Sequence, residues 1–538
     1  MIIEETKIEP VRKRSNFAEF RRGMFNVSHR IRKYDIAHER KTINVSPGQN
    51  IQDAIEKINL LGGGIVFLKI GRHIVSYNIT LKSGVYLHGE TAEGSIIDFD
   101  TSANQIKISG DRTYSTGTIS ISNNFSTVTG SSTLWAANIS TNDRILLGGQ
   151  WYTISAIGSD TSLTLSVPYG GKTLVAGTTY IIANVIKDVQ ITDLIVRGST
   201  LSAIRIQYAN EIFFRGLDVQ TSVIGMEGDD SSNILINECD FVANNSGFDF
   251  KNCHFITFNS AGTLDDLVGN GLTMNNVTNA DLDSAFFLNS AGDGINFTAC
   301  SIISCEGVIV TSAGGQGWEF VSGNKDIALI ACGAEACGSD GFKMTGTTDT
   351  IRIIGSIVND NAGYGINIAA VDCDDNIITE CSFSGNTSGA INDSGVGTQI
   401  TESNIGISNL FVKKHVRMKN TSGGSLVAGD LVTLKAVAAG DEVTTTTIQG
   451  DDLVFGMAIE AINNNSYGRI QILGKTTTLK VNGVTDIAVG DFIGTFTTAK
   501  IGMKAAVGDM AIAIALEAYI TDDSNGVIDA LLITPRKI

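Results

Sequence analysis

A glycine followed by an apolar, a polar and an apolar residue recurs through the middle of the chain. The clearest copy is the stretch GFKM, which begins at Gly341. The other copies begin at Gly225, Gly247, Gly271, Gly294, Gly317 and Gly365, with weaker ones at Ala203 and Gly389. Because successive copies are 22 to 24 residues apart, the pattern predicts a stack of structural repeats.

The polar residue of each copy stands between two apolar residues, which is the period-two pattern of a strand with one buried face. We therefore expect two columns of inward side chains that continue from coil to coil. The first column is Phe248, Leu272, Ile295, Trp318, Phe342 and Ile366, and the second is Phe250, Met274, Phe297, Phe320, Met344 and Ile368.

A repeat of about 22–24 residues holds three short strands with their turns, and it is too short for a four-stranded propeller blade. Coils stacked at strand spacing form parallel sheets, and parallel connections are almost always right-handed. The sequence therefore predicts an all-β protein whose residues 185–411 form a right-handed parallel β-helix.

The segments before the repeats have different patterns. Ile51, Ala54 and Ile58 fall at helical spacing ahead of three glycines, so residues 43–111 are expected to form a helix that caps the stack, followed by its first coils. Residues 112–184 contain alternating strands without the repeat, which we interpret as a small inserted β-barrel.

Residues 412–538 have a third sequence pattern. Asp430, Asp491 and Asp509 each follow a glycine and precede an apolar strand. Gly-Asp pairs in this position indicate turns between strands. The segment is therefore predicted to be a C-terminal β-barrel that makes trimer contacts or faces the exterior.

The net charge of −17 is unevenly distributed. Residues 1–42 carry 11 Lys and Arg against 6 Asp and Glu, whereas the remainder carries 28 against 50. Nucleic acid is an unlikely partner for so acidic a body, because phosphates are bound by clustered cations. We interpret residues 1–42 as a basic arm that folds against an acidic protein surface, with a disordered tail as the alternative.

The N-terminus lacks the cations and the long apolar core of a signal peptide, and no apolar run reaches the ~18 residues of a membrane span. We expect a chain made in the cytoplasm without membrane insertion. The 8 Cys all lie within the repeats, where small buried thiols explain them better than disulfides or zinc sites. No metal or cofactor is predicted; Cys300 with Cys305, and Cys332 with Cys337, are the only local metal candidates.

The stretch INVSPGQNIQDAIEKINLLGGGIVFL opens the predicted stack, and ACGSDGFKM, DNAGYGINI and NSAGDGINF are three of its repeat units. Together they resemble the pectate-lyase-like superfamily in the form found in bacteriophage tailspikes and related virion appendages. The insert stretch RILLGGQWYTISAIGSDTSLTLSVPY is similar to β-barrel modules of phage tail proteins, and GDLVTLKAVAAGDEV resembles domains of decoration and fibre proteins. The resemblance implies a homotrimer in the virion, made in the host cytoplasm, whose arm binds other tail, portal-proximal or capsid proteins.

Tailspikes of this family often cleave or deacetylate host glycans, but the resemblance implies a trimeric virion protein more strongly than it implies any reaction. Glycoside hydrolysis with retention needs two carboxyl groups about 5 Å apart. In the outward column Glu227 and Asp249 lie on adjacent coils, at about that spacing, where like charges raise one pKa. Asp293 and Asp340, two coils apart and ~10 Å from each other, form a second catalytic candidate pair. The candidate substrate-binding residues are Arg205, Glu319, Lys343 and Tyr364.

A plainer interpretation is that an acidic protein exposes many carboxylates without using them. The coils are nearly uniform in length, whereas polysaccharide grooves are usually built from long inserted loops. The outward column holds no aromatic side chain to stack on a sugar, and Tyr364 and Tyr208 are the nearest exposed candidates. His254 is interpreted as structural, and the stretch VDCDDN lacks the pattern of a calcium loop.

The favoured hypothesis is a tailspike-like structural appendage of a phage virion that binds host surface polysaccharide during adsorption. If it is an enzyme, it is a glycan depolymerase, either a glycoside hydrolase or a lyase. The alternative is a non-enzymatic decoration protein of the capsid or tail with no role in glycan binding.

Overall fold

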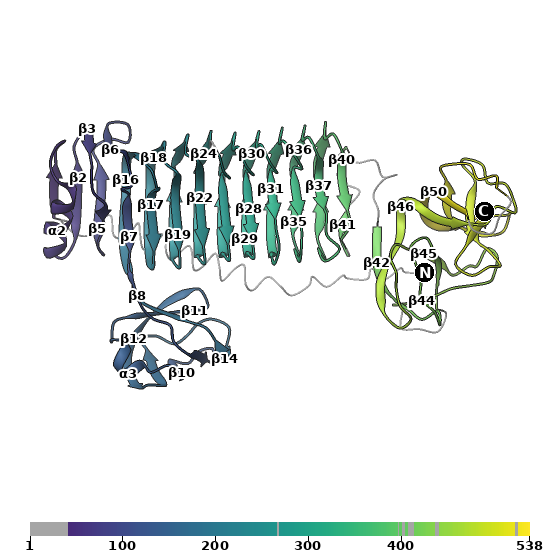
Figure 1. Ribbon diagram of the computed structural model, residues 1–538, viewed down its shortest axis with the longest axis horizontal. Coiled ribbons are helices and arrows are strands. Elements are labelled where there is room, and N and C mark those ends of the chain that lie inside the picture. The colour runs from purple at the N-terminus through teal and green to yellow at the C-terminus, as the bar shows by residue number, and fades with distance from the viewer. Residues whose placement is uncertain are drawn as a thin grey trace, which may run out of the picture.

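The computed structural model describes residues 41–265, 268–395, 397–400, 404–406, 414–435, 441–521 and 526–538. Most of these residues form one straight stack of β coils, with a small β unit attached to its side near one end and a second β unit after its other end (Figure 1). Residues 1–40 of the predicted basic arm, which was placed at residues 1–42, lie outside the described residues. The prediction of an all-β parallel β-helix is confirmed.

Most coils contribute three strands, as the repeat length predicts, whereas in two coils one long strand, Ile186–Ser199 or Ala209–Gln220, takes the place of two of them. One strand of each coil joins a parallel sheet that has eleven strands among the described residues, which we call the eleven-stranded sheet. Its members are β4 (Ile79–Thr80), β7 (Ile106–Ser109), β17 (Ser202–Gln207), β19 (Ile224–Asp229), β22 (Ser246–Lys251), β25 (Leu272–Asn275), β28 (Ile295–Thr298), β31 (Trp318–Phe320), β34 (Phe342–Met344), β37 (Tyr364–Ile368) and β40 (Gly389–Asp393).

The other two strands of each coil, separated by a corner, join a second parallel sheet that counts twenty-two strands in the described chain. They are β1 (Thr42–Val45), β2 (Gly64–Leu68), β3 (Gly71–Ile74), β5 (Val85–Gly89), β6 (Ser95–Ser102), β16 (Ile186–Ser199), β18 (Ala209–Gln220), β20 (Ser232–Asn237), β21 (Asp240–Val242), β23 (His254–Asn259), β24 (Gly262–Leu264), β26 (Thr278–Asp283), β27 (Phe286–Leu288), β29 (Ser301–Glu306), β30 (Ile309–Thr311), β32 (Lys325–Ile330), β33 (Gly333–Glu335), β35 (Arg352–Ile354), β36 (Ile357–Asn359), β38 (Ile377–Thr379), β39 (Ser382–Ser384) and β41 (Gln399–Ile400).

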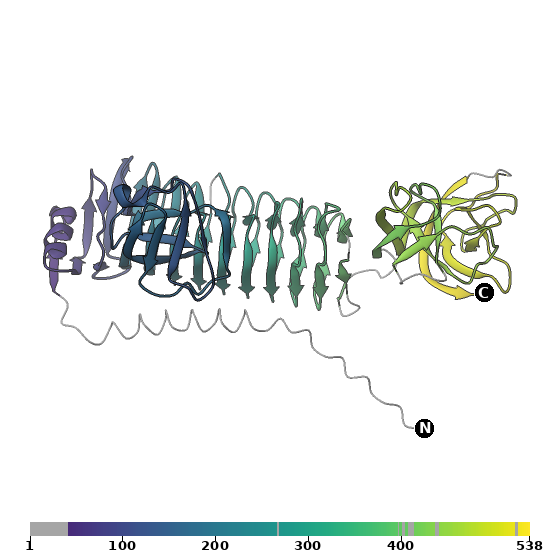
Figure 2. The same cartoon turned by 90° about the horizontal axis from the view of Figure 1, so that it is seen from below.

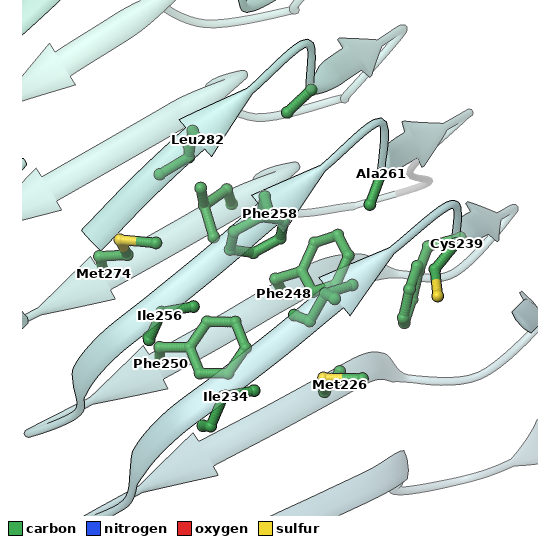
Figure 3. Packing of buried hydrophobic residues seen from close by; sticks show 14 of the residues in the cluster. Met226, Ile234, Cys239, Phe248, Phe250, Ile256, Phe258, Ala261, Met274 and Leu282 are labelled. Atoms are coloured by element: carbon green, nitrogen blue, oxygen red, sulfur yellow. The ribbon is translucent and has the colours of Figure 1, made fainter. Parts of the chain in front are cut away.

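The two predicted inward columns form the core of the stack (Figure 3). Phe248 pairs in register with Leu272 and is 1% exposed, and Trp318 pairs with Phe342 at 0% exposure each. The rings of Trp318 and Phe342 are stacked with centroids 5.6 Å apart. Burial of large apolar side chains at every coil is the main stabilisation of such a stack.

The glycine that opens each repeat is required by the close approach of neighbouring coils. A Cβ on Gly341 would lie 2.6 Å from the carbonyl oxygen of Gly365, the matching glycine of the next coil, and 2.6 Å from Cγ1 of Val358. The same clash with the next coil's backbone recurs at Gly247, Gly271, Gly294 and Gly317. The sequence motif therefore marks positions where no side chain fits.

The corner between the two strands of the larger sheet has a left-handed backbone in successive coils. Residues at this corner have φ between +48° and +63°. They are Glu238, Ser260, Ser284, Gly307, Ala331, Gly355 and Glu380. Only glycine adopts this region without steric cost, so Gly307 and Gly355 suit the backbone conformation that the corner requires.

Buried asparagines connect one coil to the next inside the turns. Asn324, 1% exposed, accepts a hydrogen bond from the Cys300 amide and donates one to the Phe297 carbonyl, both at 3.0 Å. Asn361, in a different turn of the coil, makes the same two kinds of contact with the Cys337 amide and the Ala334 carbonyl. These side chains satisfy backbone groups that the strands leave unpaired, as burial requires.

Helix α2 (Ile51–Leu60) covers the open end of the stack, as predicted. The Asn50 side chain caps it by accepting from the Asp53 amide at 3.1 Å, and the apolar face of the helix is buried. Gln52 also exchanges two hydrogen bonds with the backbone of Thr80, at 2.7 Å and 3.1 Å. The helix therefore satisfies backbone groups at the sheet edge as well as covering the core.

An antiparallel sheet, with eight strands among the described residues, projects from the side of the stack (Figure 1) and lies in front of the stack when the molecule is seen from below (Figure 2). It folds around its own apolar core and includes the short helix α3 (Trp135–Asn138). Its strands are β8 (Asp111–Tyr114), β9 (Thr118–Ile121), β10 (Thr127–Ser131), β11 (Arg144–Leu147), β12 (Gln150–Ser159), β13 (Ser162–Leu165), β14 (Leu174–Thr178) and β15 (Ile181–Asn184). We call this unit the insert.

A mixed sheet, nine-stranded in its described part, forms the C-terminal unit around two apolar cores. Its strands are β42 (Lys414–Asn420), β43 (Leu431–Leu434), β44 (Glu442–Thr444), β45 (Val454–Ala458), β46 (Tyr467–Val481), β47 (Phe492–Thr495), β48 (Gly502–Lys504), β49 (Met510–Ala515) and β50 (Gly526–Lys537). The predicted Gly-Asp turns are present: the carboxylates of Asp430, Asp491 and Asp509 accept from the amides of Val427, Ala488 and Ala506.

All 8 cysteines are free and buried, which confirms the interpretation of the thiols as small core side chains. Burial raises the pKa of Cys332 to about 12 and that of Cys300 to about 11. These thiols remain protonated at neutral pH and behave as apolar groups.

Candidate functional site

The outward side chains of the eleven-stranded sheet form a continuous row that we call the outer column. Consecutive members pair in register from coil to coil. They are Lys107, Arg205, Glu227, Asp249, Thr273, Asn296, Glu319, Lys343, Asn367 and Asn392, and each is half-buried. The column thus offers charged and amide groups at strand spacing, about 4.8 Å, along most of the stack.

Glu227 is held by neighbours from the preceding coil. The Arg205 guanidinium forms an ion pair with Oε1 of Glu227, and the Ser202 hydroxyl donates to Oε2 at 3.1 Å. Both side chains of the ion pair are 29% exposed. Arg205 is therefore engaged by a carboxylate of its own chain, and a substrate group would have to share or displace that contact.

Asp249 lies directly above Glu227 in the ladder. Burial raises the pKa of Asp249, and the carboxylates of Glu227 and Asp229 raise it further, while Lys251 acts in the opposite direction. The sequence predicted these two carboxyl groups on adjacent coils, and the structure brings them together. A carboxyl group with a raised pKa beside a second carboxyl group is an arrangement used for general acid catalysis, so the pair stays a catalytic candidate.

Asp293 and Asp340 are joined to the backbone of the following coil instead of facing each other. Asp293 accepts from the Gln316 amide at 2.8 Å, and Asp340 accepts from the Tyr364 amide at 2.7 Å. Gln316 lies between them in this ladder and accepts from the Asp340 amide at 2.8 Å. Asp340 is 7% exposed, and Asn367 donates to its second oxygen at 2.8 Å. The two aspartates thus lie two coils apart with Gln316 between them, as the repeat count predicted, and their use as a catalytic pair stays a prediction.

Asp293 is instead grouped with Glu319. The Asn296 side-chain amide donates to Asp293 at 3.1 Å and to Glu319 at 2.9 Å, and the Lys343 ammonium lies 3.4 Å from Glu319. Burial raises the pKa of Glu319 and Asp293 raises it further, while Lys343 opposes the shift. This group joins a predicted catalytic residue to two predicted binding residues in a combination that the sequence analysis missed.

The grouping was missed because Asp293 belongs to the turn and Glu319 to a strand one coil later. Their side chains converge because the Asp293 backbone is fixed by its own ladder, in which Asn270 accepts from the Asp293 amide at 2.8 Å. The only sequence signal is the polar residue Asn296, three positions after Asp293 and in register with Glu319.

The two tyrosines proposed as sugar-stacking candidates lie in different environments. Tyr364 is half-buried at the start of β37, and its ring lies 3.8 Å from where a Cβ on Gly389 would be. Tyr208 is only 9% exposed and packs with Trp151, Ala183 and Val185 where the insert meets the stack. The expectation of an exposed Tyr208 is wrong, because residues of the insert pack against its side chain.

His254 is covered by the insert as well. A Cβ on Gly149 of the insert would lie 2.5 Å from His254 Nδ1, and this nitrogen is hydrogen-bonded to the Thr278 hydroxyl. Burial lowers the pKa of His254 to about 4. The side chain is therefore neutral at physiological pH and has a structural position, as the sequence indicated.

A further carboxyl pair, on the larger sheet, was not singled out from the sequence. Asp218 and Asp240 are neighbours in register on adjacent coils. Burial raises the pKa of Asp218 and of Asp240, and their mutual repulsion adds to the shift of Asp218. They lie on a different sheet from the outer column.

The described residues contain no group of three or more His, Cys, Asp or Glu arranged to hold a metal ion. In the same part of the chain, no helix is long and apolar enough to cross a membrane.

Comparison of the sequence with protein families and with characterised proteins finds no match. Solved structures with similar folds include the A-module of a mannuronan C-5 epimerase from Azotobacter vinelandii, with a TM-score of 0.43 and 14% identity over 66% of this chain and 93% of that one. The tailspike of Pseudomonas phage phi297 has a TM-score of 0.37 and 11% identity over 90% and 88%. The catalytic unit of an α-1,3-glucanase from Streptomyces thermodiastaticus has a TM-score of 0.41 and 10% identity over 69% and 70%.

Proposed function

We propose that this protein is a tailspike-like appendage of a phage virion whose outer column binds a polysaccharide of the host surface. The observation that carries the proposal is the outer column itself. Its half-buried carboxylate, amide and cationic groups repeat along a rigid, straight face. An extended polysaccharide presents hydroxyl groups at regular intervals, and such groups are recognised by charged and amide side chains fixed in space.

The remaining parts of the proposal concern assembly. The basic arm, residues 1–42, attaches the protein to other virion proteins, and the stack is the rigid shaft of a homotrimer. The C-terminal unit contacts the stack, because Arg469 donates to the Ser394 carbonyl at 2.6 Å while it is paired with Glu460. This hydrogen bond supports a direct contact between the end of the shaft and the C-terminal unit.

Two carboxyl groups carry any cleavage activity that accompanies binding. Asp249 and Glu319 have raised pKa values and each lies beside a second carboxylate. A protonated carboxyl group can give its proton to the leaving oxygen of a glycosidic bond, and the neighbouring carboxylate can stabilise the positive charge that develops. We assign this activity to the class of glycan depolymerases.

The test uses the purified full-length protein and the surface polysaccharide of its bacterial host. Size-exclusion chromatography of the polysaccharide before and after incubation detects cleavage, and co-elution with protein detects binding. We expect Asp249→Asn and Glu319→Gln to abolish cleavage and to retain binding. Polysaccharide that neither shortens nor co-elutes, with an active depolymerase as positive control, would rule out the glycan role.

A second function is supported by the uniform coils. From β22 to β37 the strands of the eleven-stranded sheet recur without a long inserted loop, and no described member of the outer column is aromatic. Both features suit a decoration protein of capsid or tail that binds no glycan. Locating the protein on the particle with specific antibodies separates the two functions, since a decoration protein is distributed over the capsid or the tail tube.

A further inference from the structure

The charges along the outer column restrict the kind of polysaccharide that it can hold. We call the part of the column from Arg205 to Lys343 the central segment, which spans six strand spacings or about 29 Å. Charged side chains lie on the segment itself, two residues later on the same strands, and directly before the repeat glycines. The cations are Arg205, Lys251 and Lys343, and the carboxylates are Glu227, Asp229, Asp249, Asp293, Glu319 and Asp340.

The cation at the start of the central segment already has a carboxylate partner. Arg205 forms an ion pair with Glu227, and Asp249 follows Glu227 in register on the next coil. A sugar carboxylate on Arg205 would either displace Glu227 and leave it unpaired, or add a third negative charge to the group. Both outcomes are unfavourable, because a half-buried charge loses hydration and needs a counter-ion in return.

The cation at the far end of the central segment is engaged in the same way. The Lys343 ammonium lies 3.4 Å from Glu319, and Glu319 shares the Asn296 amide with Asp293. Burial raises the pKa of Glu319, and the Asp293 carboxylate raises it further. Negative charge is therefore in excess around Lys343, and an anionic ligand would add to that excess.

Lys251 does not reverse the balance at the middle of the segment. It is exposed at the end of β22 and lies in register with Asp229 on the preceding coil. Burial raises the pKa of Asp249, and Glu227 raises it further even though Lys251 acts in the opposite direction. The carboxylates thus outweigh this cation.

Lys107 lies outside the central segment, one coil before Arg205. Its register neighbours in the ladder are Arg205 and Thr80. An acidic group could therefore meet an unshared cation only at this end of the outer column, and not along the stretch where the carboxylates are grouped.

The same side chains suit a ligand that offers hydroxyl groups. Asp249 and Glu319 can accept hydrogen bonds from sugar hydroxyls, and bonds to an ionised acceptor are stronger than neutral ones. Half-buried Thr273 and Asn296 lie between them in the ladder and supply a hydroxyl and an amide. Hydroxyl recognition needs no free cation.

We propose that the outer column selects a polysaccharide without acidic groups. Glu227 and Glu319 set this selectivity, because they occupy the two cations of the central segment. Selectivity of this kind comes from repulsion of the wrong ligand as well as attraction of the right one. The inference rests on the proposed glycan function and adds the chemical class of the ligand.

The test compares two forms of one polysaccharide on the full-length protein. The first is the purified surface polysaccharide of the host, and the second is the same material after its primary hydroxyl groups have been oxidised to carboxylates. We expect the native form to bind and the oxidised form to bind about tenfold more weakly or worse. Raising the salt from ~0.1 M to ~1 M shortens the screening length from about 10 Å to about 3 Å and should narrow the difference.

A charge-removal variant shows whether the two glutamates cause the difference. Glu227→Gln with Glu319→Gln keeps the side-chain shape and frees both cations, so it should recover most of the lost affinity for the oxidised form. Its binding of the native form is retained and shows that the variant is folded. The matched control is Glu306→Gln with Glu335→Gln, which removes the same charge from exposed positions on the larger sheet and should recover nothing.

The failures of this inference and of the glycan function give different results. A host polysaccharide that binds and itself contains uronic acid, sulfate or phosphate would overturn the inference and leave the glycan function standing. Equal affinity for the native and oxidised forms, or equal recovery in the two double variants, would do the same. A native polysaccharide that does not bind would overturn the glycan function and this inference with it.

Discussion

Asp293 and Glu319 share a single donor, because the Asn296 amide nitrogen lies 3.1 Å from one carboxylate and 2.9 Å from the other. One amide group cannot neutralise two negative charges, and Lys343 reaches only Glu319. Burial raises the pKa of Glu319, and the neighbouring Asp293 carboxylate raises it further. A chemical role and a cost in stability both follow from this arrangement.

Replacement of Glu319 by Gln should stabilise the protein at neutral pH by roughly 0.2–1 kcal/mol, the usual range for like charges on neighbouring strands. A carboxyl group whose pKa is higher in the folded state binds more protons when folded. The free energy of unfolding therefore falls as the pH rises from about 4.3, the pKa of an unperturbed Glu, through the higher pKa of Glu319 in the folded protein. The gain from Glu319→Gln should vanish at acidic pH, measured by denaturant unfolding across pH.

The matched control is Glu335→Gln, at an exposed carboxylate without an ion-pair partner among the described residues. It should leave stability unchanged at both pH values in monomeric conditions. A Glu319→Gln variant that is less stable than wild type at pH 7 would mean that the Lys343 contact outweighs the repulsion from Asp293.

His254 should make the protein lose stability on acidification. Its pKa is about 4 in the folded protein and about 6.5 when unfolded. The unfolded chain therefore binds the proton first, and stability is lost as pH falls from 6.5 towards 4, by on the order of 2–3 kcal/mol. The difference in unfolding free energy between wild type and His254→Gln, followed from pH 7 to pH 4, isolates this contribution.

The position of the insert offers a control for the cause of that shift. Gly149→Ala places a Cβ 2.5 Å from His254 Nδ1 and forces a side chain into φ +86°. It should loosen the insert and move the His254 pKa back towards its ordinary value. Unchanged pH dependence in this variant would show that the stack alone buries the histidine.

The buried thiols should be unreactive in the native protein. Burial raises the pKa of Cys337 to about 11, and the thiolate is the reactive form. We expect iodoacetamide at pH 8 to leave the native mass unchanged and to add 8 labels after denaturation. Val175→Cys, at a 72% exposed position, should take one label at once and serves as the positive control. Rapid labelling of any natural cysteine would mean that a coil opens.

Gly341→Ala should destabilise the stack by about 1–3 kcal/mol, the usual effect of forcing a methyl group into a filled core. The added Cβ would lie 2.6 Å from the Gly365 carbonyl oxygen, and neither coil can move without disturbing the ladder. Thermal unfolding measures the effect. Gly170→Ala, where nothing lies within 4 Å of the new Cβ, is the control and should have no effect; equal melting temperatures of the two variants would contradict the explanation.

The buried side chains of the stack could be predicted from sequence periodicity, because whether a side chain points inward depends only on its position along the strand. Phe248 and Trp318 could be placed from the repeat alone, and the helix that begins at Ile51 could be placed from the helical spacing of its apolar residues. The role of Asn324 could not, since an asparagine in a turn gives no sign of being buried and bonded to a different coil. Its recurrence at matching turn positions is the signal that would have revealed it.

The candidate site was predictable only where its members share one column. Glu227 and Asp249 lie in register, so counting along the repeats was enough to bring them together. Asp293 and Glu319 meet across a turn and a strand, and their approach depends on turn geometry that a repeat count does not include. Tyr208 was misplaced because its cover comes from the insert, which interrupts the periodic pattern.

Successive coils have nearly the same number of residues, so the shaft can be lengthened or shortened by whole coils. Ile295 and Phe342 occupy equivalent inward positions on either side of Trp318. Loss of residues 318–341 would therefore bring Ile295 directly against Phe342 and shorten the shaft by one rung, about 4.8 Å. Gene duplication or deletion of such units lets a lineage alter the reach of the protein while its two ends stay the same.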